Sequence, residues 1–291
     1  MKRLEPSELI LNPDGSIFHL HLKPEHISGT IILVGDPDRV ELISGFFDSI
    51  EVNIRNREFL THTGSYKNKR LTVISTGIGT DNIDIVINEL DALVNIDLKK
   101  RIPRKNITSL NLIRIGTSGA IQKEIPIGSF LLTKTAIGFD GLLNFYANRT
   151  KISDLKFEQS FTNFVNWKAD FPSPYIVKAD EYLLTKLKGD KIIEGVTISA
   201  PGFYGPQGRV IRLQTAMPDL NRKIAAFEYE GEKITNYEME SSAIYGLAKL
   251  LGHRAVTICA IIANRASKEF SSNYKPIIKD LIEYTLNRLT R

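Results

Sequence analysis

Isolated arginines, two of them beside glycine, are the residues best suited to bind an anion. Arg39 ends the segment GDPDR at 35–39, Arg114 begins RIGTSGA at 114–120, and Arg57 lies on a further candidate strand. A buried arginine is costly unless an anion or a carboxylate meets it, and its guanidinium offers a planar fork for phosphate oxygens. The pattern predicts a phosphate-sized anion site. The alternatives are an ordinary turn at 35–39 and a buried carboxylate partner for Arg114.

A glutamine and an arginine two residues apart could read the edge of a planar amide. Gln207 and Arg209 lie in FYGPQGR at 203–209, and in an extended stretch such residues point the same way. Glutamine offers a donor and an acceptor while the guanidinium offers donors alone, which suits the edge of a pyrimidine base. Phe203 could stack on that ring. The alternative is a surface turn.

Two carboxylates flank a methionine in NYEMES at 236–241. Glu238 and Glu240 could accept hydrogen bonds from two adjacent hydroxyls, while Met239 supplies apolar contact. Acids at the start of a helix also complement the helix dipole, which is the alternative explanation. A further charge, Arg265, follows the apolar run 255–263.

These segments follow short apolar, β-branched runs that alternate with segments of helical period. The strands expected are 30–34, 70–75, 110–115, 130–136, 196–200 and 255–263. Helices are expected at 81–96, at 240–251 before Gly252, and from 275 onward, with a helix start after Arg39. This alternation predicts one α/β domain over 1–291, with a largely parallel sheet whose strand ends gather the motifs.

Composition excludes several classes of protein. The 291 residues are 42% hydrophobic with a net charge of +5, which is too apolar and too weakly charged for a disordered chain. The single cysteine, Cys259, excludes an internal disulfide. The longest apolar run, 255–263, is too short to span a membrane, and no apolar region follows the N-terminal charges. We expect a cytoplasmic protein that binds neither membranes nor nucleic acid.

Two segments interrupt the alternation. The basic stretch 98–109 is expected to form a solvated surface loop, with a binding patch as the alternative. The aromatic stretch 140–172 lacks a clean period, so it is expected to pack as an irregular excursion or to cover a site or partner surface.

Taken in order, a series of short motifs resembles the nucleoside phosphorylase-I family, and within it the branch that cleaves uridine. The motifs are FHL at 18–20, GDPDR at 35–39, NREF at 56–59, STGIG at 75–79, RIGTSGAIQ at 114–122, FYGPQGR at 203–209, YEMES at 237–241 and ANR at 263–265. The resemblance spans about 18–270. It implies a three-layer α/β/α fold with a central mixed, partly barrel-like sheet flanked by helices.

The resemblance also implies a role for each matching residue. Phosphate would be bound by Gly35, Arg39, Arg57, Arg114 and Thr117. The ribose would be bound by His19, Glu238, Met239 and Glu240. The base would meet Phe203, Gln207, Arg209, Ile262, Ala263 and Arg265. The residues expected to carry catalysis are Arg39, Arg114, Gln207 and Arg209. Because His19 and Arg57 would come from a neighbouring subunit, a homodimer is implied, either alone or as a hexamer of three dimers.

The implied activity is phosphorolysis of uridine, and of deoxyuridine, with inorganic phosphate as co-substrate and no cofactor. Purine-cleaving members place an acid after the strand that here ends in Ala263-Asn264-Arg265, which favours a pyrimidine. The alternatives are a purine nucleoside phosphorylase or nucleosidase of the same fold, and a non-catalytic nucleoside-binding protein. Glu58 and Ile78 match part of a potassium site at the family's dimer interface, with Asn82 in place of serine.

Overall fold

A single mixed sheet organises the molecule. The computed structural model describes residues 3–291. The sheet consists of β1 Thr30–Val34, β2 Ser49–Asn56, β3 Phe59–Tyr66, β4 Lys69–Ser75, β7 Asn111–Ala120, β8 Phe130–Gly138, β9 Tyr175–Lys178, β10 Ile192–Ser199, β11 Glu228–Tyr229, β12 Glu232–Glu238, β13 Arg254–Asn264 and β14 Glu269–Phe270. Its main path runs β11-β12-β10-β8-β13-β7-β1-β4-β3-β2, with β9 beside β8 and β14 beside β13. A separate hairpin joins β5 Ile96–Asp97 to β6 Ile102–Pro103.

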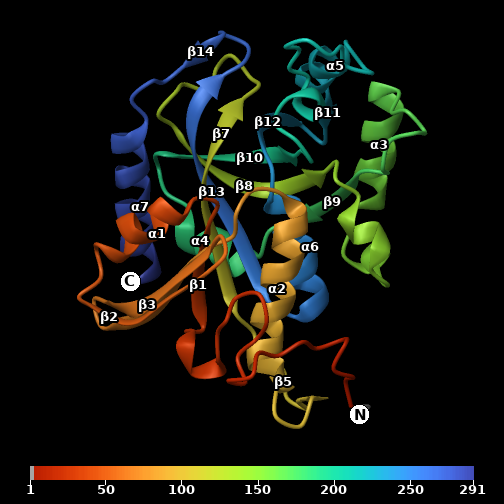
Figure 1. Cartoon of the computed structure of the whole chain (residues 1–291). Helices are drawn as coiled ribbons and strands as arrows, with labels where there is room; N and C mark the ends of the chain where they lie inside the picture. Colours follow the sequence, from red (N-terminus) through yellow and green to blue (C-terminus); the bar gives the residue numbers. More distant parts are fainter. Residues whose placement is uncertain (1–2) are drawn as a thin grey trace.

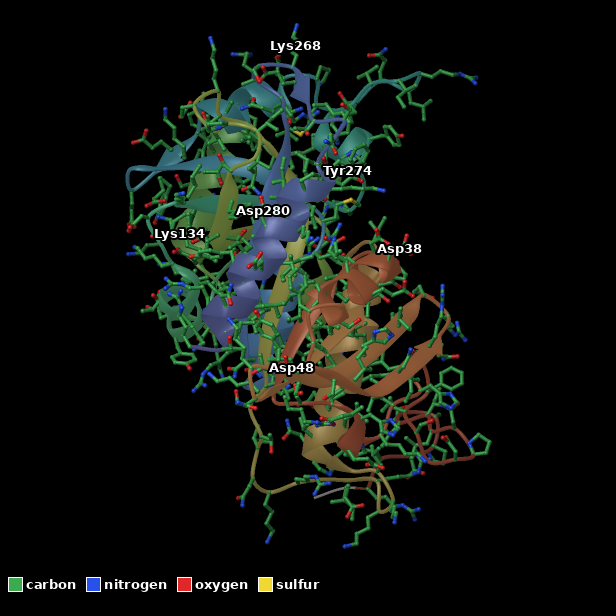
Figure 2. The ribbon with its side chains drawn as sticks, turned by 90° about the vertical axis from the view of Figure 1, so that its left-hand side faces the viewer. Asp38, Asp48, Lys134, Lys268, Tyr274 and Asp280 are labelled. Carbon is green, nitrogen blue, oxygen red and sulfur yellow. The ribbon has the colours of Figure 1, made fainter. Side chains whose placement is uncertain are left out.

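Helices cover the sheet on more than one side. They are α1 Pro37–Ser44, α2 Thr80–Asn95, α3 Leu155–Val165, α4 Glu181–Leu187, α5 Leu220–Ala226, α6 Ser241–Leu251 and α7 Lys275–Leu289. Figure 1 shows α2 and α6 side by side on one side of β13 and α7 on the other. Figure 2, turned by 90°, looks onto α7, which carries Asp280 and lies over the strands. The expected α/β architecture with a mixed central sheet flanked by helices is confirmed.

The centre of the sheet is parallel and apolar on both faces. Strand β1 lies parallel to β4 on one side and to β7 on the other, and β7 lies parallel to β13. Most residues of β1, β7 and β13 are buried, as the continuous apolar runs predicted. Each of the six expected strands lies within or overlaps an observed one. Parallel strands end at one edge, so the residues that follow β1 and β7 are brought close together.

One pairing converts part of the sheet into a closed ring. Strand β12 lies parallel to β10 but also pairs antiparallel with β7, through Asn236 with Ala120 and Tyr237 with Gly119. Strands β7, β13, β8, β10 and β12 therefore form a continuous circuit. Because β12 carries Glu238 at its end and β7 carries Arg114, this closure brings the two charges to the same cavity.

The two segments that interrupt the alternation, 140–172 and 98–109, can be compared with what was expected for them. The aromatic stretch contains α3, whose Phe157 and Phe161 pack with Phe139 and Phe227 in a buried cluster, so packing explains most of its composition. The basic stretch is mostly exposed, as expected, and residues 98–103 form the turn and the second strand of the β5–β6 hairpin. Over residues 3–291, each helix is too short or too polar to cross a bilayer.

Candidate active site

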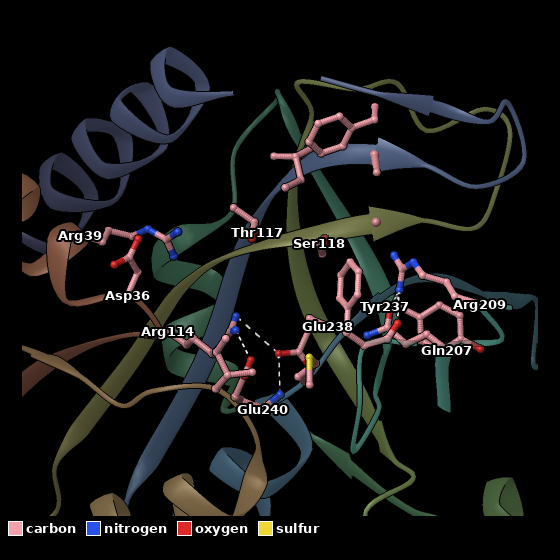
Figure 3. Close-up of a pocket in the computed structure, with 18 of the residues that line it drawn as sticks. Asp36, Arg39, Arg114, Thr117, Ser118, Gln207, Arg209, Tyr237, Glu238 and Glu240 are labelled. Atoms are coloured by element: carbon pink, nitrogen blue, oxygen red, sulfur yellow. Dashed lines mark hydrogen bonds and ion pairs between the residues drawn. The ribbon is translucent and has the colours of Figure 1, made fainter. Parts of the chain in front are cut away.

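A cavity of about 520 Å³ opens at the strand ends and is within the usual size of a small-molecule site (Figure 3). It brings together most of the residues predicted from the sequence. Those lining it are Gly35, Arg39, Arg114, Thr117, Phe203, Gln207, Arg209, Glu238, Met239, Glu240, Ile262 and Ala263. Ile78 also lines it. The other predicted residues, His19, Arg57, Glu58, Asn82 and Arg265, do not line it.

At one end of the cavity the turn after β1 presents Arg39. Asp36 caps α1 by accepting a hydrogen bond from the backbone N–H of Asp38 at 3.0 Å, which fixes the turn. A Cβ atom on Gly35 would lie 3.3 Å from the carbonyl oxygen of Gly77, so glycine allows the two loops to approach closely. Burial, and next the charge of Arg114, lowers the pKa of Arg39. An anion placed between the two guanidinium groups would offset that repulsion.

Arg114 lies on β7 among buried charges. Its guanidinium forms an ion pair with Glu240, lies 3.5 Å from Glu238 and 3.5 Å from Sγ of Cys259. Burial works against the charged form, but the carboxylates of Glu240 and Glu238 raise the pKa of Arg114 overall. A Cβ atom at Gly116 would overlap the guanidinium, so any larger residue there would displace Arg114 from this position. The carboxylate partner considered for Arg114 is therefore present, and the same side chain still lines the cavity.

The two glutamates enter the cavity from the junction of β12 and α6. Glu238 accepts hydrogen bonds from the backbone N–H groups of Glu240 and Ser241 at 3.0 to 3.1 Å, and from the hydroxyl of Ser199. Glu240 accepts one from the N–H of Gly79 at 2.9 Å. Burial raises the pKa of Glu240, opposed by Arg114. Helix capping and cavity lining are thus combined in one segment.

At the other end of the cavity, Gln207 and Arg209 lie side by side. The Arg209 guanidinium donates to Oε1 of Gln207 and to the carbonyl of Phe203, and its Cζ lies 3.7 Å from the centroid of the Phe203 ring. The expected extended stretch is wrong. Gly205–Gln207 forms a 3₁₀ turn that ends at Gly208 in the left-handed region, and it is this turn that brings the pair together.

Phe203 lines the cavity with one face of its ring covered. Its side chain is about half exposed, and the Arg209 guanidinium lies over its ring. A base could stack on this face of the ring only after the guanidinium had moved.

Several further residues line the cavity although no role of their own was predicted for them from the sequence. They are Asp36, Pro37, Ser118, Gly119, Tyr237 and Phe270. All but Phe270 lie within the motifs at 35–39, 114–122 and 237–241, so the sequence pattern already contained them. Phe270 reaches the cavity because β14 folds back antiparallel on β13, a hairpin that the apolar pattern does not reveal.

Of the predicted residues outside the cavity, His19 and Arg57 lie away from it, and Arg265 contacts the loop that carries Gln207. His19 pairs with Glu89 at 2.7 Å, and its carbonyl accepts a hydrogen bond from Asn56. Arg57 lies in the turn between β2 and β3 with φ of +54°, so its expected place on a strand is wrong, and its Cζ lies 5.8 Å from the centroid of the Phe18 ring. Arg265 donates to the backbone carbonyl of Gln207.

The possible cation ligands lie together near the cavity mouth. A Cβ atom on Gly77 would lie 2.3 Å from Nδ2 of Asn82 and 3.5 Å from Cγ of Glu58, and Ile78 is the next residue. The three residues are therefore neighbours, and their role as potassium ligands stays a prediction.

Comparison with known proteins agrees with this geometry. The model of the phosphorylase superfamily matches residues 30–285. The uridine phosphorylase of Thermococcus kodakarensis is 32% identical over 259 residues, covering 88% of this chain and 80% of that protein. The Escherichia coli uridine phosphorylase is 28% identical, covering 87% and 88%. A Trypanosoma brucei nucleoside phosphorylase, described as showing uridine phosphorylase activity, superposes with a TM-score of 0.88 at 30% identity, covering 97% and 99%. With the sheet, the cavity and these similarities in agreement, the chain belongs to the phosphorylase superfamily.

Proposed function

We propose that this protein is a uridine phosphorylase that converts uridine and phosphate reversibly into uracil and α-D-ribose 1-phosphate, with deoxyuridine as a second substrate. The observation that carries the proposal is the placement of Arg39 and Arg114 at one end of a single cavity and of Gln207 and Arg209 at the other, with Glu238 and Glu240 lining it as well. Similar proteins that carry the name uridine phosphorylase support it.

The reaction needs positioning more than acid–base chemistry. The glycosidic bond breaks with its electron pair leaving on the uracil ring nitrogen, while a phosphate oxygen forms a bond to the anomeric carbon. Arg39, Arg114 and the hydroxyl of Thr117 would hold the phosphate, and the carboxylates of Glu238 and Glu240 would accept hydrogen bonds from the ribose hydroxyls. Cations at both ends stabilise the entering anion and the leaving base.

Gln207 and Arg209 together present a donor, an acceptor and a donor. The amide Nε2 donates, Oε1 has a second lone pair beyond the one that Arg209 occupies, and the guanidinium has further N–H groups. Uracil presents the complementary order of carbonyl, ring N–H and carbonyl. Cytosine replaces one carbonyl by an amine and the ring N–H by a bare nitrogen, so it would leave buried groups unpaired.

A purine substrate has less support. Purine-cleaving relatives use an acid after the strand that is β13 here, whereas this strand ends in Asn264. Its amide donates to the carbonyls of Gln122 and Ile125, and its Oδ1 accepts from the N–H groups of Ala266 and Ser267. Asn264 is thus committed to the turn, so protonation of a purine leaving group has no donor at this position.

A steady-state assay tests the proposal directly. We expect uracil and ribose 1-phosphate from uridine only when phosphate is present, with cytidine cleaved about 100-fold less efficiently. Faster cleavage of inosine would favour a purine nucleoside phosphorylase, and release of free ribose without phosphate would favour a nucleosidase. Binding of uridine without turnover under either condition would identify a non-catalytic protein.

The active unit on this proposal is a homodimer, alone or in a hexamer, in which His19 and Arg57 complete the partner's cavity. Both residues lie outside the cavity of their own chain, and Arg57 is exposed at a turn. Residues 1–291 would act as one domain. The cytoplasmic location and a potassium ion near Glu58, Ile78 and Asn82 stay predictions.

A further inference from the structure

A side chain outside the cavity holds the peptide that carries the base-reading amide. Asn221 lies in the first turn of α5, and its Nδ2 donates to the backbone carbonyl of Gln207 at 3.1 Å. Its Oδ1 accepts from the hydroxyl of Tyr237 at 2.8 Å. A carbonyl oxygen can only accept, so the orientation of the amide is fixed by its partners. Asn221 thereby connects the loop that carries Gln207 to β12, the strand that ends at Glu238.

The same carbonyl has a second donor. The guanidinium of Arg265, at the end of β13, also donates to the oxygen of Gln207, and its Cζ lies 5.5 Å from the centroid of the Tyr237 ring. Both lone pairs of this oxygen are then occupied, by donors from two different elements. The Gln207 residue is only 3% exposed, so its main chain and its side chain are both confined.

The loop sequence is adapted to this contact. Gly208 has φ of +71° and a Cβ atom there would lie 2.2 Å from Nδ2 of Asn221. Glycine is therefore needed both for the backbone conformation and for the approach of the amide. Helix α5 is held in place by other groups, because Leu220 and Ile224 are buried and Lys223 donates to the carbonyl of Val165 at 2.8 Å. These contacts hold the helix without Asn221, so the hydrogen bonds of Asn221 serve to position the loop.

We propose that Asn221 is a positioning residue for base selection, which sets the place of the Gln207 amide in the cavity through the backbone of Gln207. This inference rests on the proposed function, because it assigns Gln207 to the base. The amide must match a donor and an acceptor on the base at once, so a displacement of about 1 Å can cost about 100-fold in rate. Arg265 acts with it on the same oxygen, in addition to or in place of the base contact expected from the sequence.

The test is Asn221→Asp, an isosteric change that keeps the acceptor for Tyr237 but replaces the donor by a carboxylate facing a carbonyl. We expect kcat/KM for uridine to fall about tenfold or more, the preference for uridine over cytidine to narrow, and KM for phosphate to stay unchanged. Asn221→Ala should act in the same direction but more weakly, since water can replace the donor.

The matched control is Asn163→Asp on α3, where the exposed amide oxygen accepts from Gln159 and a carboxylate can accept as well. It should leave kcat/KM for uridine, the preference for uridine over cytidine and KM for phosphate unchanged. The positioning role is overturned if Asn221→Asp retains wild-type base preference, or if KM for phosphate rises in step with KM for uridine, as general loosening of the fold would cause.

Calorimetric titration of uracil separates this inference from the proposed function. If the wild-type protein fails to cleave uridine, the proposed function falls. The affinity for uracil then still tests the role of Asn221. Weaker binding in Asn221→Asp than in the wild-type protein supports the positioning role. Equal binding in the two proteins, or no detectable binding in either, overturns it.

Discussion

Arg114 shares its charge between two carboxylates that also line the cavity. Glu240 pairs with it directly and Glu238 lies 3.5 Å away, all three being buried. A buried charge left without its partner is strongly destabilising, whereas removing a whole buried pair is often tolerated. The contribution of Arg114 to folding can therefore be separated from its contribution to phosphate binding.

Replacement of Arg114 by methionine should lower the free energy of unfolding by about 3 to 5 kcal/mol, because Glu240 is left buried and unpaired. Adding Glu240→Gln should recover a large part of this loss, while phosphorolysis stays undetectable in both variants. Urea unfolding and the uridine assay measure the two effects. If the double variant were no more stable than Arg114→Met, the ion pair would not be the source of the loss.

The residues that carry charge were predictable, and their connections were not. Arginine in an apolar run signals an anion or a carboxylate, and here it meets the carboxylates and lines the predicted anion site at once. Asn221 had no signal, because it acts on a backbone carbonyl and any helix surface can carry an asparagine. The extended geometry considered for Gln207 and Arg209 was wrong, because Gly205–Gln207 forms a 3₁₀ turn that ends at Gly208 with positive φ.

At the level of elements, the apolar central strands were predictable and the polar ones were missed. Strand β12 reads EKITNYE and β2 is largely exposed, so neither shows the continuous apolar run of β1 or β13. The pairing of β12 with β7, which shapes the cavity, is made by backbone pairing and by one hydrogen bond from the amide of Asn236 to the hydroxyl of Ser118, and neither produces a periodic apolar pattern. Short helices such as α4 and α5 have too few turns to establish a period.

A histidine links two of the peripheral elements and should make the fold sensitive to acid. His62 on β3 is buried, and its Nδ1 lies 2.8 Å from the hydroxyl of Ser44 at the end of α1. Burial lowers the pKa of His62 below its usual 6.5, with Glu41 opposing the shift. The unfolded chain thus takes up a proton near pH 6.5, while the folded chain does so only at lower pH.

The unfolded chain therefore gains free energy from protonation of His62 before the folded chain does. The free energy of unfolding is unaffected by protonation of His62 above pH 6.5 and decreases as the pH falls below it. We expect the melting temperature of the wild-type protein to fall between pH 7.5 and 5.5, and to fall less in His62→Gln. Differential scanning calorimetry at the two pH values measures the change. An equal fall in both proteins would show that other groups cause the acid sensitivity.

At the level of the whole molecule, the chain builds a cavity but keeps two of its predicted ligands elsewhere. His19 is held by Glu89, and Arg57 lies beside Phe18, so the two elements meet in a surface region away from their own cavity lining. A second copy of the chain is the simplest source of these residues, and rotational symmetry would then complete two cavities at once.

Co-expression of Arg57→Ala and Arg114→Ala chains with different tags tests this arrangement. In purified mixed dimers one cavity combines an intact Arg114 with an intact Arg57 from the partner, so about half of the sites should be active. Each variant alone should be nearly inactive towards uridine. Mixed dimers as inactive as either parent would show that the cavities are not shared.

The closure of β12 on β7 has a consequence for how the protein loses activity on heating. Two ladder pairs, Asn236 with Ala120 and Tyr237 with Gly119, join these strands, whereas β7 and β13 pair at ten positions. A few further hydrogen bonds support this short seam, among them one from the amide of Asn236 to the hydroxyl of Ser118 at 3.0 Å. Local unfolding requires the least free energy where few residue pairs must be broken. Opening this seam would carry Tyr237 and Glu238 away from Arg114 while the parallel core stays intact. Heat would then inactivate the enzyme through a small, reversible opening at a temperature below that of global melting.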